Sequence, residues 1–362
     1  MRAWQYTTTT GGLEKNLLLN ASAPVPQPSP SQHLGRILAT SFNPVDYKIA
    51  EIRLVSYFAI PKPATPGIDE HANKHPQFAG YLVTPAAGSA LKPGQLVIGA
   101  SGTSLLAGGG LAEYAVAKDD QIVAIPEGLG PILASTIFVA GITAHQSIVP
   151  YVKAGDRIFI NGGSGGAGVF GIQFAKAVGC HVMTTCSSTN VELCKSLGAD
   201  AVIDYKKQNP LEALKAGSHQ FDHVVDNVGS NFELYWKCHE YTRPGALFMA
   251  IGADISGAFV MDTISRKYWP AFLGGGKRQS VHFAPKAQPT DLEKIATWMK
   301  EGRVRAVIDE QFTFEQAHQA IERLKTGRAK GKIVVEVSSY GSTQVSMRFW
   351  RGPFCALYTV TG

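Results

Sequence analysis

The feature that most constrains this chain is a glycine-rich turn at residues 161–168, which reads Asn-Gly-Gly-Ser-Gly-Gly-Ala-Gly. An apolar run at 157–160 precedes the turn, and a helix-like run at 169–178 follows it. The pyrophosphate of a dinucleotide needs this order of strand, glycine turn and helix, because the backbone must approach the phosphates and the first helical N–H groups bind the anion. The spacing G-x-G-x-x-G therefore predicts a cofactor site, formed by Gly163, Ser164, Gly165, Gly166, Ala167 and Gly168.

The residues after the next strand-like run, at 181–185, indicate which nucleotide is bound. Proteins that prefer NAD place Asp or Glu there to accept hydrogen bonds from the ribose 2′-OH. Residues 186–190 are instead Cys-Ser-Ser-Thr-Asn, and hydroxyls can donate to a 2′-phosphate that a carboxylate would repel. The sequence favours NADPH over NADH, with Ser187, Ser188 and Tyr205 as ligands. The two serines are also suited to an N-cap for a helix at 191–197, and both interpretations can hold together.

Composition excludes several classes of protein. With 362 residues, 45% hydrophobic and 17% charged, the chain predicts a globular protein of two domains. No run approaches the length of a membrane span, and the N-terminus has no apolar core typical of a signal peptide, so we expect a cytoplasmic location and no membrane partner. The five cysteines show no repeating spacing and predict reduced thiols. The net charge of +6 suits an anionic cofactor, and without a basic stripe we expect no nucleic acid partner.

The residue composition and hydrophobic pattern change along the chain and predict four segments. Residues 1–124 carry short apolar runs broken by Pro and Gly, which predicts a β-rich domain. Residues 125–265 alternate strand and helix patterns, which indicates parallel βαβ units. We expect 266–338 to return to the first domain and 339–362 to form a poorly ordered tail. In the third segment, residues 290–293 and 313–316 each predict a capping box, and the basic residues of 325–332 predict a solvated face.

Several motifs in one order resemble the medium-chain dehydrogenase/reductase superfamily, in its zinc-independent quinone oxidoreductase (zeta-crystallin-like) and enone reductase branch. They lie at 41–48 (Ser-Phe-Asn-Pro-Val-Asp-Tyr-Lys), 65–69, 110–116, 140–144, the glycine turn, 196–200 and 328–335. The stretch Phe-Leu-Gly-Gly-Gly-Lys-Arg at 272–278 resembles fungal members in particular. The resemblance covers about residues 1–338. It implies an α/β protein with a GroES-like catalytic domain, a six-stranded doubly wound Rossmann domain and NADPH-dependent hydride transfer.

Two features bear on activity and on metals. Family members run straight from Pro-Gly-x-Asp into an apolar strand, whereas here residues 70–77 intervene as an apparent insertion close to the expected substrate site. Zinc-dependent relatives need thiolates around the metal, but no cysteine precedes Cys180, and Asn43 stands where a zinc-type relative has its first cysteine. His71 and His75 have helical spacing, but the loop-like setting favours a solvated insertion. We therefore expect no metal site.

Hydride delivery to a conjugated carbonyl builds negative charge on the carbonyl oxygen, so the site needs a hydrogen-bond donor there and an acid for the α-carbon. The motif at 43–48 supplies three donors. We expect Tyr47 and Lys48 to polarise the substrate and Asn43 to position the substrate or the nicotinamide ribose. Residue types alone would instead favour Tyr47 in the core and Lys48 in a surface pair with Asp46. The family resemblance reverses that preference.

Other positions are expected to complete the coenzyme site. Thr143 is placed at the nicotinamide edge, although a buried helical threonine explains it nearly as well. Asn227 and Gly252 follow strand-like runs, and ligands of an open α/β sheet bind at such strand ends. The leading function is a reductase of a quinone or an α,β-unsaturated carbonyl compound, in fungal secondary metabolism, acting as a monomer or homodimer on a small molecule. A carbonyl or alcohol dehydrogenase, and a nucleotide-binding scaffold that has lost catalysis, are the alternatives.

Overall fold

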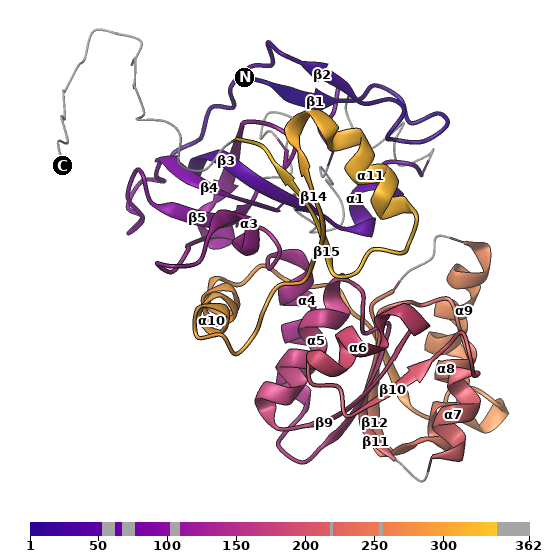
Figure 1. Cartoon of the computed structure of the whole chain (residues 1–362). Coiled ribbons are helices and arrows are strands. Elements are labelled where there is room, and N and C mark those ends of the chain that lie inside the picture. Colours follow the sequence, from indigo (N-terminus) through magenta and orange to yellow (C-terminus); the bar gives the residue numbers. More distant parts are fainter. Residues whose placement is uncertain (53–61, 67–76, 102–108, 218–219, 253–255, 339–362) are drawn as a thin grey trace, which may run out of the picture.

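The chain forms two sheets of different kind, stacked one above the other in Figure 1 and joined near helices α4 and α10. The computed structural model describes residues 1–52, 62–66, 77–101, 109–217, 220–252 and 256–338. The expected C-terminal tail and residues 70–76 of the apparent insertion lie outside this part of the chain. Gln77, which the sequence suggested was the end of that insertion, instead begins strand β4 and is buried.

The cofactor-type sheet has six parallel strands in the order β10-β9-β8-β11-β12-β13. Its strands are β8 (Arg157–Asn161), β9 (His181–Cys186), β10 (Ala201–Asp204), β11 (Phe221–Asp226), β12 (Thr242–Ala250) and β13 (Gln279–His282). This is the doubly wound sheet that the sequence predicted. Its sixth strand lies past residue 265, so this sheet extends into the segment that was expected to belong to the first domain.

Alternate side chains of β8 explain why helices cover both faces of this sheet. Ile158 and Ile160 join one apolar cluster with α4, α5 and α6, whereas Phe159 points to the other face and joins a cluster with α7 and α8. A strand buried on both faces reads as a continuous apolar run, as residues 157–160 do. The helices of this part of the chain are α4 (Val139–Ile148), α5 (Gly166–Val178), α6 (Val191–Ser196), α7 (Pro210–Ala216), α8 (Glu233–Trp236) and α9 (Gly257–Tyr268). Helix α3 (Pro131–Ala134) contacts the other sheet, and α10 (Pro289–Lys300) packs on α4.

The other sheet is mostly antiparallel and contains the N-terminal segment. Its order is β14-β15-β3-β4-β5-β7, with β6 also paired to β3, and β14 runs parallel to β15. The strands are β3 (Gln32–Phe42), β4 (Gln77–Thr84), β5 (Leu96–Ala100), β6 (Tyr114–Lys118), β7 (Ile122–Ala124), β14 (Ile308–Thr313) and β15 (Lys332–Glu336), accompanied by α1 (Pro44–Lys48), α11 (Ala317–Lys325) and a separate pair, β1 (Ala3–Gln5) with β2 (Leu18–Asn20). Three elements from the C-terminal part of the chain thus lie with the N-terminal segment: β15 pairs with β3, β14 pairs with β15, and α11 contacts both strands.

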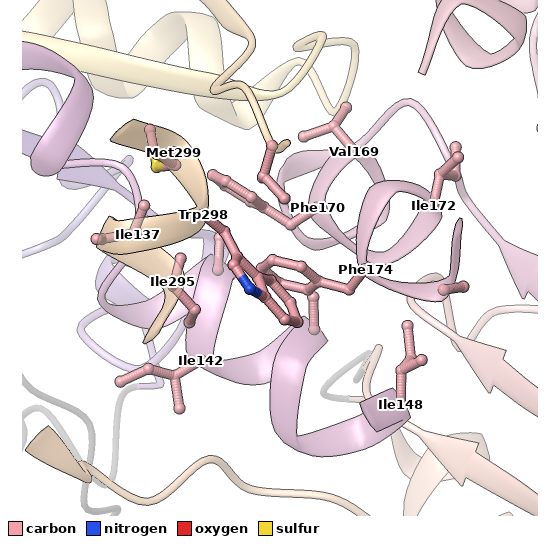
Figure 2. Packing of buried hydrophobic residues seen from close by; sticks show 14 of the residues in the cluster. Ile137, Ile142, Ile148, Val169, Phe170, Ile172, Phe174, Ile295, Trp298 and Met299 are labelled. Atoms are coloured by element: carbon pink, nitrogen blue, oxygen red, sulfur yellow. The ribbon is translucent and has the colours of Figure 1, made fainter. Parts of the chain in front are cut away.

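Helix α10 packs against α4 and α5 through an aromatic cluster, shown in Figure 2. The ring centroid of Trp298 lies 5.5 Å from that of Phe174, which in turn lies 5.9 Å from that of Phe170. The helix begins at Pro289 and not at the capping box expected at 290–293, and its preceding residue makes no side-chain cap. The capping box at Thr313 and Gln316 is present. Burial of these large rings holds α10 against the helices that flank the glycine turn.

Candidate active site

The strand order reverses between β8 and β11, so the C-terminal ends of these two strands open the crevice where doubly wound sheets bind ligands. The two ends are tied together by Asn161, whose Nδ2 donates to Asp226 Oδ1 at 2.8 Å. Asn227 follows β11 and donates from Nδ2 to the carbonyl of Asn161 at 3.1 Å. Gly252, after β12, donates its N–H to the carbonyl of Asp226. The predicted ligands Asn227 and Gly252 thus lie together at this edge of the sheet.

The glycine turn between β8 and α5 has a different use for each glycine. A Cβ atom on Gly168 would lie 2.2 Å from the carbonyl oxygen of Gly162 and 2.7 Å from the Cα of Gly163, so the backbone is too close for any side chain. A Cβ on Gly165 would meet only Gly162 O, at 3.5 Å, which leaves that side of the turn open. The positive φ of the turn, 80°, is at Gly162, directly before the first glycine of the G-x-G-x-x-G spacing.

Helix α5 begins at Gly166, directly after the turn. Amides in the first turn of a helix lack carbonyl partners within it, and those of Ala167 and Gly168 are suited to an anion. Asn190, which was not predicted, connects this turn to the next strand by donating from Nδ2 to Ser164 Oγ at 3.1 Å. These residues fit the pyrophosphate of a dinucleotide.

The hydroxyl-rich loop after β9 lies beside the end of β10. Ser188 hydrogen bonds to Asp204 and holds the pKa of that carboxyl below its usual value. The hydroxyl oxygens of Ser187 and Thr189 lie 3.3 Å apart in this loop, and Thr189 Oγ1 also donates to Asn190 Oδ1 at 3.4 Å. Tyr205 is exposed at the same edge, with the Nζ of Lys206 5.6 Å from its ring centroid.

The substrate-side motif at 43–48 forms the short helix α1 at the end of β3. Asn43 is buried before this helix, and its N–H donates to Asp46 Oδ2 at 2.7 Å. Its side-chain Oδ1 accepts a hydrogen bond from Lys332 Nζ, which also donates to the carbonyl of Phe42. Burial lowers the pKa of Lys332 to about 7, while the nearby Asp46 acts in the opposite direction.

Tyr47 and Lys48 do not occupy equivalent places. The ring of Tyr47 packs against the core of the antiparallel sheet, and Lys325 Nζ on α11 lies 5.7 Å from its centroid. Burial, with Glu51 close by, raises the pKa of Tyr47 above its ordinary value. Lys48 ends α1 and is partly exposed. Thr143 lies within α4 and is buried.

Two residues of the site were misjudged from the sequence. Lys332 was expected on a solvated basic face, yet it is only 2% exposed. The sequence did contain a signal for its burial: Lys332 directly precedes Ile333, Val334 and Val335, an apolar run typical of a buried strand. Gln77 was taken for part of a loop, yet it donates from Nε2 to the carbonyl of Ser41 and accepts at Oε1 from the N–H of Val139. It therefore connects β3 to the start of α4.

The residues around Asn43 do not suit a metal cation. The oxygen that Asn43 presents already faces a buried ammonium, which would repel a metal ion. Within the described ranges, no group of three or more His, Cys, Asp or Glu side chains is arranged to bind a metal. His71 and His75 lie outside those ranges. In the same part of the chain, no helix is long and apolar enough to cross a bilayer.

Comparison with known proteins agrees with this architecture. The family model for "Zinc-binding dehydrogenase" matches residues 197–335. The trans-enoyl reductase pgmF of Aspergillus terreus is 44% identical over 352 residues, covering 93% of this chain and 96% of the relative. The chain belongs to the medium-chain dehydrogenase/reductase superfamily. It is an oxidoreductase of that superfamily, as its sequence motifs implied.

Other members of the superfamily match over similar lengths. The chloroplastic quinone-oxidoreductase homolog of Spinacia oleracea is 31% identical and covers 93% of this chain and 98% of the relative. The structure of the quinone oxidoreductase from Coxiella burnetii has a TM-score of 0.78 and 26% identity, covering 93% of this chain and 99% of that chain. The mycobacterial Rv1454c structure, complexed with NADPH, has a TM-score of 0.71 at 19% identity and supports the fold alone. Superfamily neighbours thus include a protein with a bound nicotinamide cofactor.

Proposed function

We propose that this chain is an NADPH-dependent reductase that delivers hydride to the C=C bond of an α,β-unsaturated carbonyl compound, with quinones as the second substrate class. The observation that carries the proposal is the glycine turn where the strand order reverses. Gly331, directly before β15, contacts this turn, and Lys332 links it to Asn43. The printed name of the 44%-identical fungal relative supports an enoyl substrate, and its source agrees with the fungal stretch at 272–278 and with a place in fungal secondary metabolism.

The coenzyme is assigned to the edge of the parallel sheet. The backbone of residues Gly163, Ser164, Gly165, Gly166, Ala167 and Gly168 would hold the pyrophosphate. Ser187 and the nearby Lys206 would bind the 2′-phosphate, with Ser188 held by Asp204 and Tyr205 beside the adenosine. Thr143, Asn227 and Gly252 would line the nicotinamide end. Asp204 is a carboxylate near this phosphate; its Oδ1 accepts from the N–H of Lys206 at 3.0 Å, and the Nζ of Lys207 lies 3.8 Å from its Oδ2.

When bound, NADPH supplies the hydride. As the hydride reaches the β-carbon, negative charge develops on the substrate's carbonyl oxygen, and a donor there lowers the barrier. Lys48 is assigned to that oxygen and to the proton that the α-carbon needs, because its ammonium both donates and holds a proton. Tyr47 is assigned as a second donor, and Asn43 positions the substrate or the nicotinamide ribose through its Nδ2.

The test is the loss of NADPH absorbance with a panel of enones, enoyl thioesters, quinones and aldehydes. Reduction of enones or enoyl thioesters supports the proposal, and reduction of quinones alone would move the chain to the second substrate class. Turnover of aldehydes only would favour a carbonyl reductase. Tight NADPH binding without turnover on the whole panel would favour a nucleotide-binding protein that has lost catalysis, and would overturn the proposal.

A further inference from the structure

Lys332 is a charged residue in a place where charge is costly. It begins β15, it is 2% exposed, and the residues that follow it, Ile333, Val334 and Val335, are fully buried. Removing an ammonium from water carries a large free-energy penalty unless strong hydrogen bonds replace the lost water. A methionine or leucine of similar length would avoid that penalty, so the contacts of the ammonium explain what the lysine does.

Both hydrogen-bond acceptors of Lys332 lie at one point of the antiparallel sheet. Its Nζ donates to the carbonyl of Phe42 at 2.7 Å and to Oδ1 of Asn43. Phe42 ends β3, and Asn43 stands directly before α1. The ammonium therefore holds both backbone and side chain at the start of the substrate-side motif. Asn43 is 289 residues from Lys332 in the chain.

The chemistry of the ammonium determines how the Asn43 amide is oriented. The Nζ of Lys332 donates to Oδ1 of Asn43, so the oxygen end of the amide faces the lysine. The N–H of Asn43 is bound to Asp46 Oδ2, which fixes the backbone from the other side. The amide nitrogen Nδ2 is consequently the donor end that remains for a ligand. Lys332 and the capping box of α1, in which the Asn43 side chain also accepts from the backbone N–H of Asp46, favour the same orientation of the amide.

The same end of β15 also lies against the glycine turn, to which the pyrophosphate of the coenzyme is assigned. The N–H of Gly331 donates to the carbonyl of Ser164 at 2.9 Å, and Gly331 forms a parallel bridge with Gly165. A Cβ atom on Gly166 would lie 3.2 Å from Cδ of Lys332, so the lysine's methylenes pack against the turn. Gly331 and Lys332 thus contact the glycine turn through the Gly331 backbone and the Lys332 methylenes. The ammonium of the same lysine contacts Asn43.

We propose that Lys332 is a positioning residue for hydride transfer: it sets the Asn43 amide, and with it the substrate-side motif, in register with the coenzyme turn. This inference rests on the proposed function, in which Asn43 contacts the substrate or the nicotinamide ribose. Lys332 itself is enclosed by protein and acts only through Asn43 and Phe42.

The first test replaces the ammonium and keeps the methylene packing. Lys332→Met should lower kcat by between about tenfold and a hundredfold, because misplaced reacting groups cost that much, while KM changes little. In an Asn43→Ala background, Lys332→Met should cause a much smaller further loss than it does alone, since residues that act through one another are not additive. Lys330→Met, an exposed lysine in the same segment, is the matched control and should retain the activity of the wild type. Native kcat in Lys332→Met, or additive losses in the double variant, would overturn the inference.

A second variant covers the case in which Lys332→Met does not fold. Asn43→Asp keeps an oxygen for Lys332 but has no Nδ2, so it should fold, retain NADPH binding and lose kcat. Native kcat in Asn43→Asp would show that the donor end of the amide is unused, and the inference would fail.

A readout without turnover separates this inference from the proposed function. The circular dichroism of bound NADPH, in the absorption band of the reduced nicotinamide, should change in the same way in Lys332→Met and Asn43→Ala, and not in Lys330→Met. If this pattern appears and no enone or quinone is reduced, the proposed function fails and the role of Lys332 stands. If turnover is found and the band of Lys332→Met is native, the role of Lys332 fails alone. Absence of NADPH binding in the wild type would refute both.

Discussion

Asn190 donates from its side-chain Nδ2 to Ser164 Oγ across 3.1 Å, joining the loop after β9 to the glycine turn. The two parts of the proposed coenzyme site, one for the pyrophosphate and one for the 2′-phosphate, are thereby held at a fixed spacing. Asn190 is itself buried, and Ser164 is partly exposed.

Asn190→Ala should therefore weaken NADPH binding. A net contribution of about 1 kcal/mol for one hydrogen bond corresponds to a Kd about fivefold higher. The measurement is a fluorescence titration of NADPH, with Asn20→Ala, exposed on β2, as the control. An unchanged Kd in Asn190→Ala would mean that the bond does not shape the coenzyme site.

Alanine variants of Gly168 and Gly165 should distinguish the effect of the turn on stability from its effect on NADPH binding. Gly168→Ala would place a methyl group 2.2 Å from a backbone carbonyl, so it should lower the free energy of unfolding by about 2–3 kcal/mol or more. Gly165→Ala has space and a φ of −81°, so its stability should change by less than about 1 kcal/mol.

Gly165→Ala should nonetheless bind NADPH at least about tenfold more weakly, since the methyl group occupies the side of the turn assigned to the pyrophosphate. Urea unfolding and NADPH titration of both variants check the pair. Full coenzyme affinity in Gly165→Ala would contradict the assignment of the turn.

Much of the fold could be predicted because its signals are local. The glycine turn, the apolar run of β8 and the alternation of strands and helices each occupy a short window, and together they indicated the parallel sheet and its ligand edge. The capping box at Thr313 was also correct. The N-cap at 290–293 was not, because Pro289 starts the helix earlier.

The role of Lys332 could not be predicted, because its meaning depends on Phe42 and Asn43, 290 and 289 residues away. A basic residue beside other basic residues resembles a solvated face until the sheet order is known. The orientation of the Tyr47 ring is a second example. It depends on where α11 packs, and no pattern within 43–48 carries that information.

Lys48 and Tyr47 are distinguished by their surroundings, and their variants should differ accordingly. Lys48→Met should lower kcat by about a hundredfold, the usual range for a lost acid or polarising donor, with NADPH affinity nearly intact. Tyr47→Phe should lower it less, because its ring packs on the side of α11. Steady-state kinetics with the best enone of the panel measures both. Native turnover in both variants would remove the two residues from the mechanism.

Coenzyme choice should respond to one added carboxylate. Ser187→Asp would place negative charge where the 2′-phosphate is assigned, so the ratio of kcat/KM for NADPH to that for NADH should fall by at least about tenfold, or about 1.4 kcal/mol. Ser22→Asp adds the same charge at an exposed position far along the chain and serves as the control. An unchanged ratio in Ser187→Asp would contradict the 2′-phosphate assignment.

His223 should make the stability of the parallel sheet depend on pH. It is buried in β11, its Nε2 bonds the carbonyl of Ser147 at 2.7 Å, and Tyr151 stacks on its ring. Burial lowers its pKa to about 4, against the opposing effects of the Ser147 carbonyl and of Asp156. Between that value and the unfolded pKa of about 6.5, the unfolded chain binds a proton that the folded chain does not, so stability falls as the pH is lowered through this window.

The loss is absent above about pH 6.5 and reaches about 3 kcal/mol at the acid end of the window. His223→Gln keeps a donor for Ser147 and removes the titration. Urea unfolding at about pH 7 and about pH 4.5 should therefore show a larger loss of stability in the wild type than in His223→Gln. Carboxylates titrate in both proteins, so their effect drops out of this comparison. Equal losses would mean that His223 is charged in the folded state, and that its ring is more open to water than its contacts indicate.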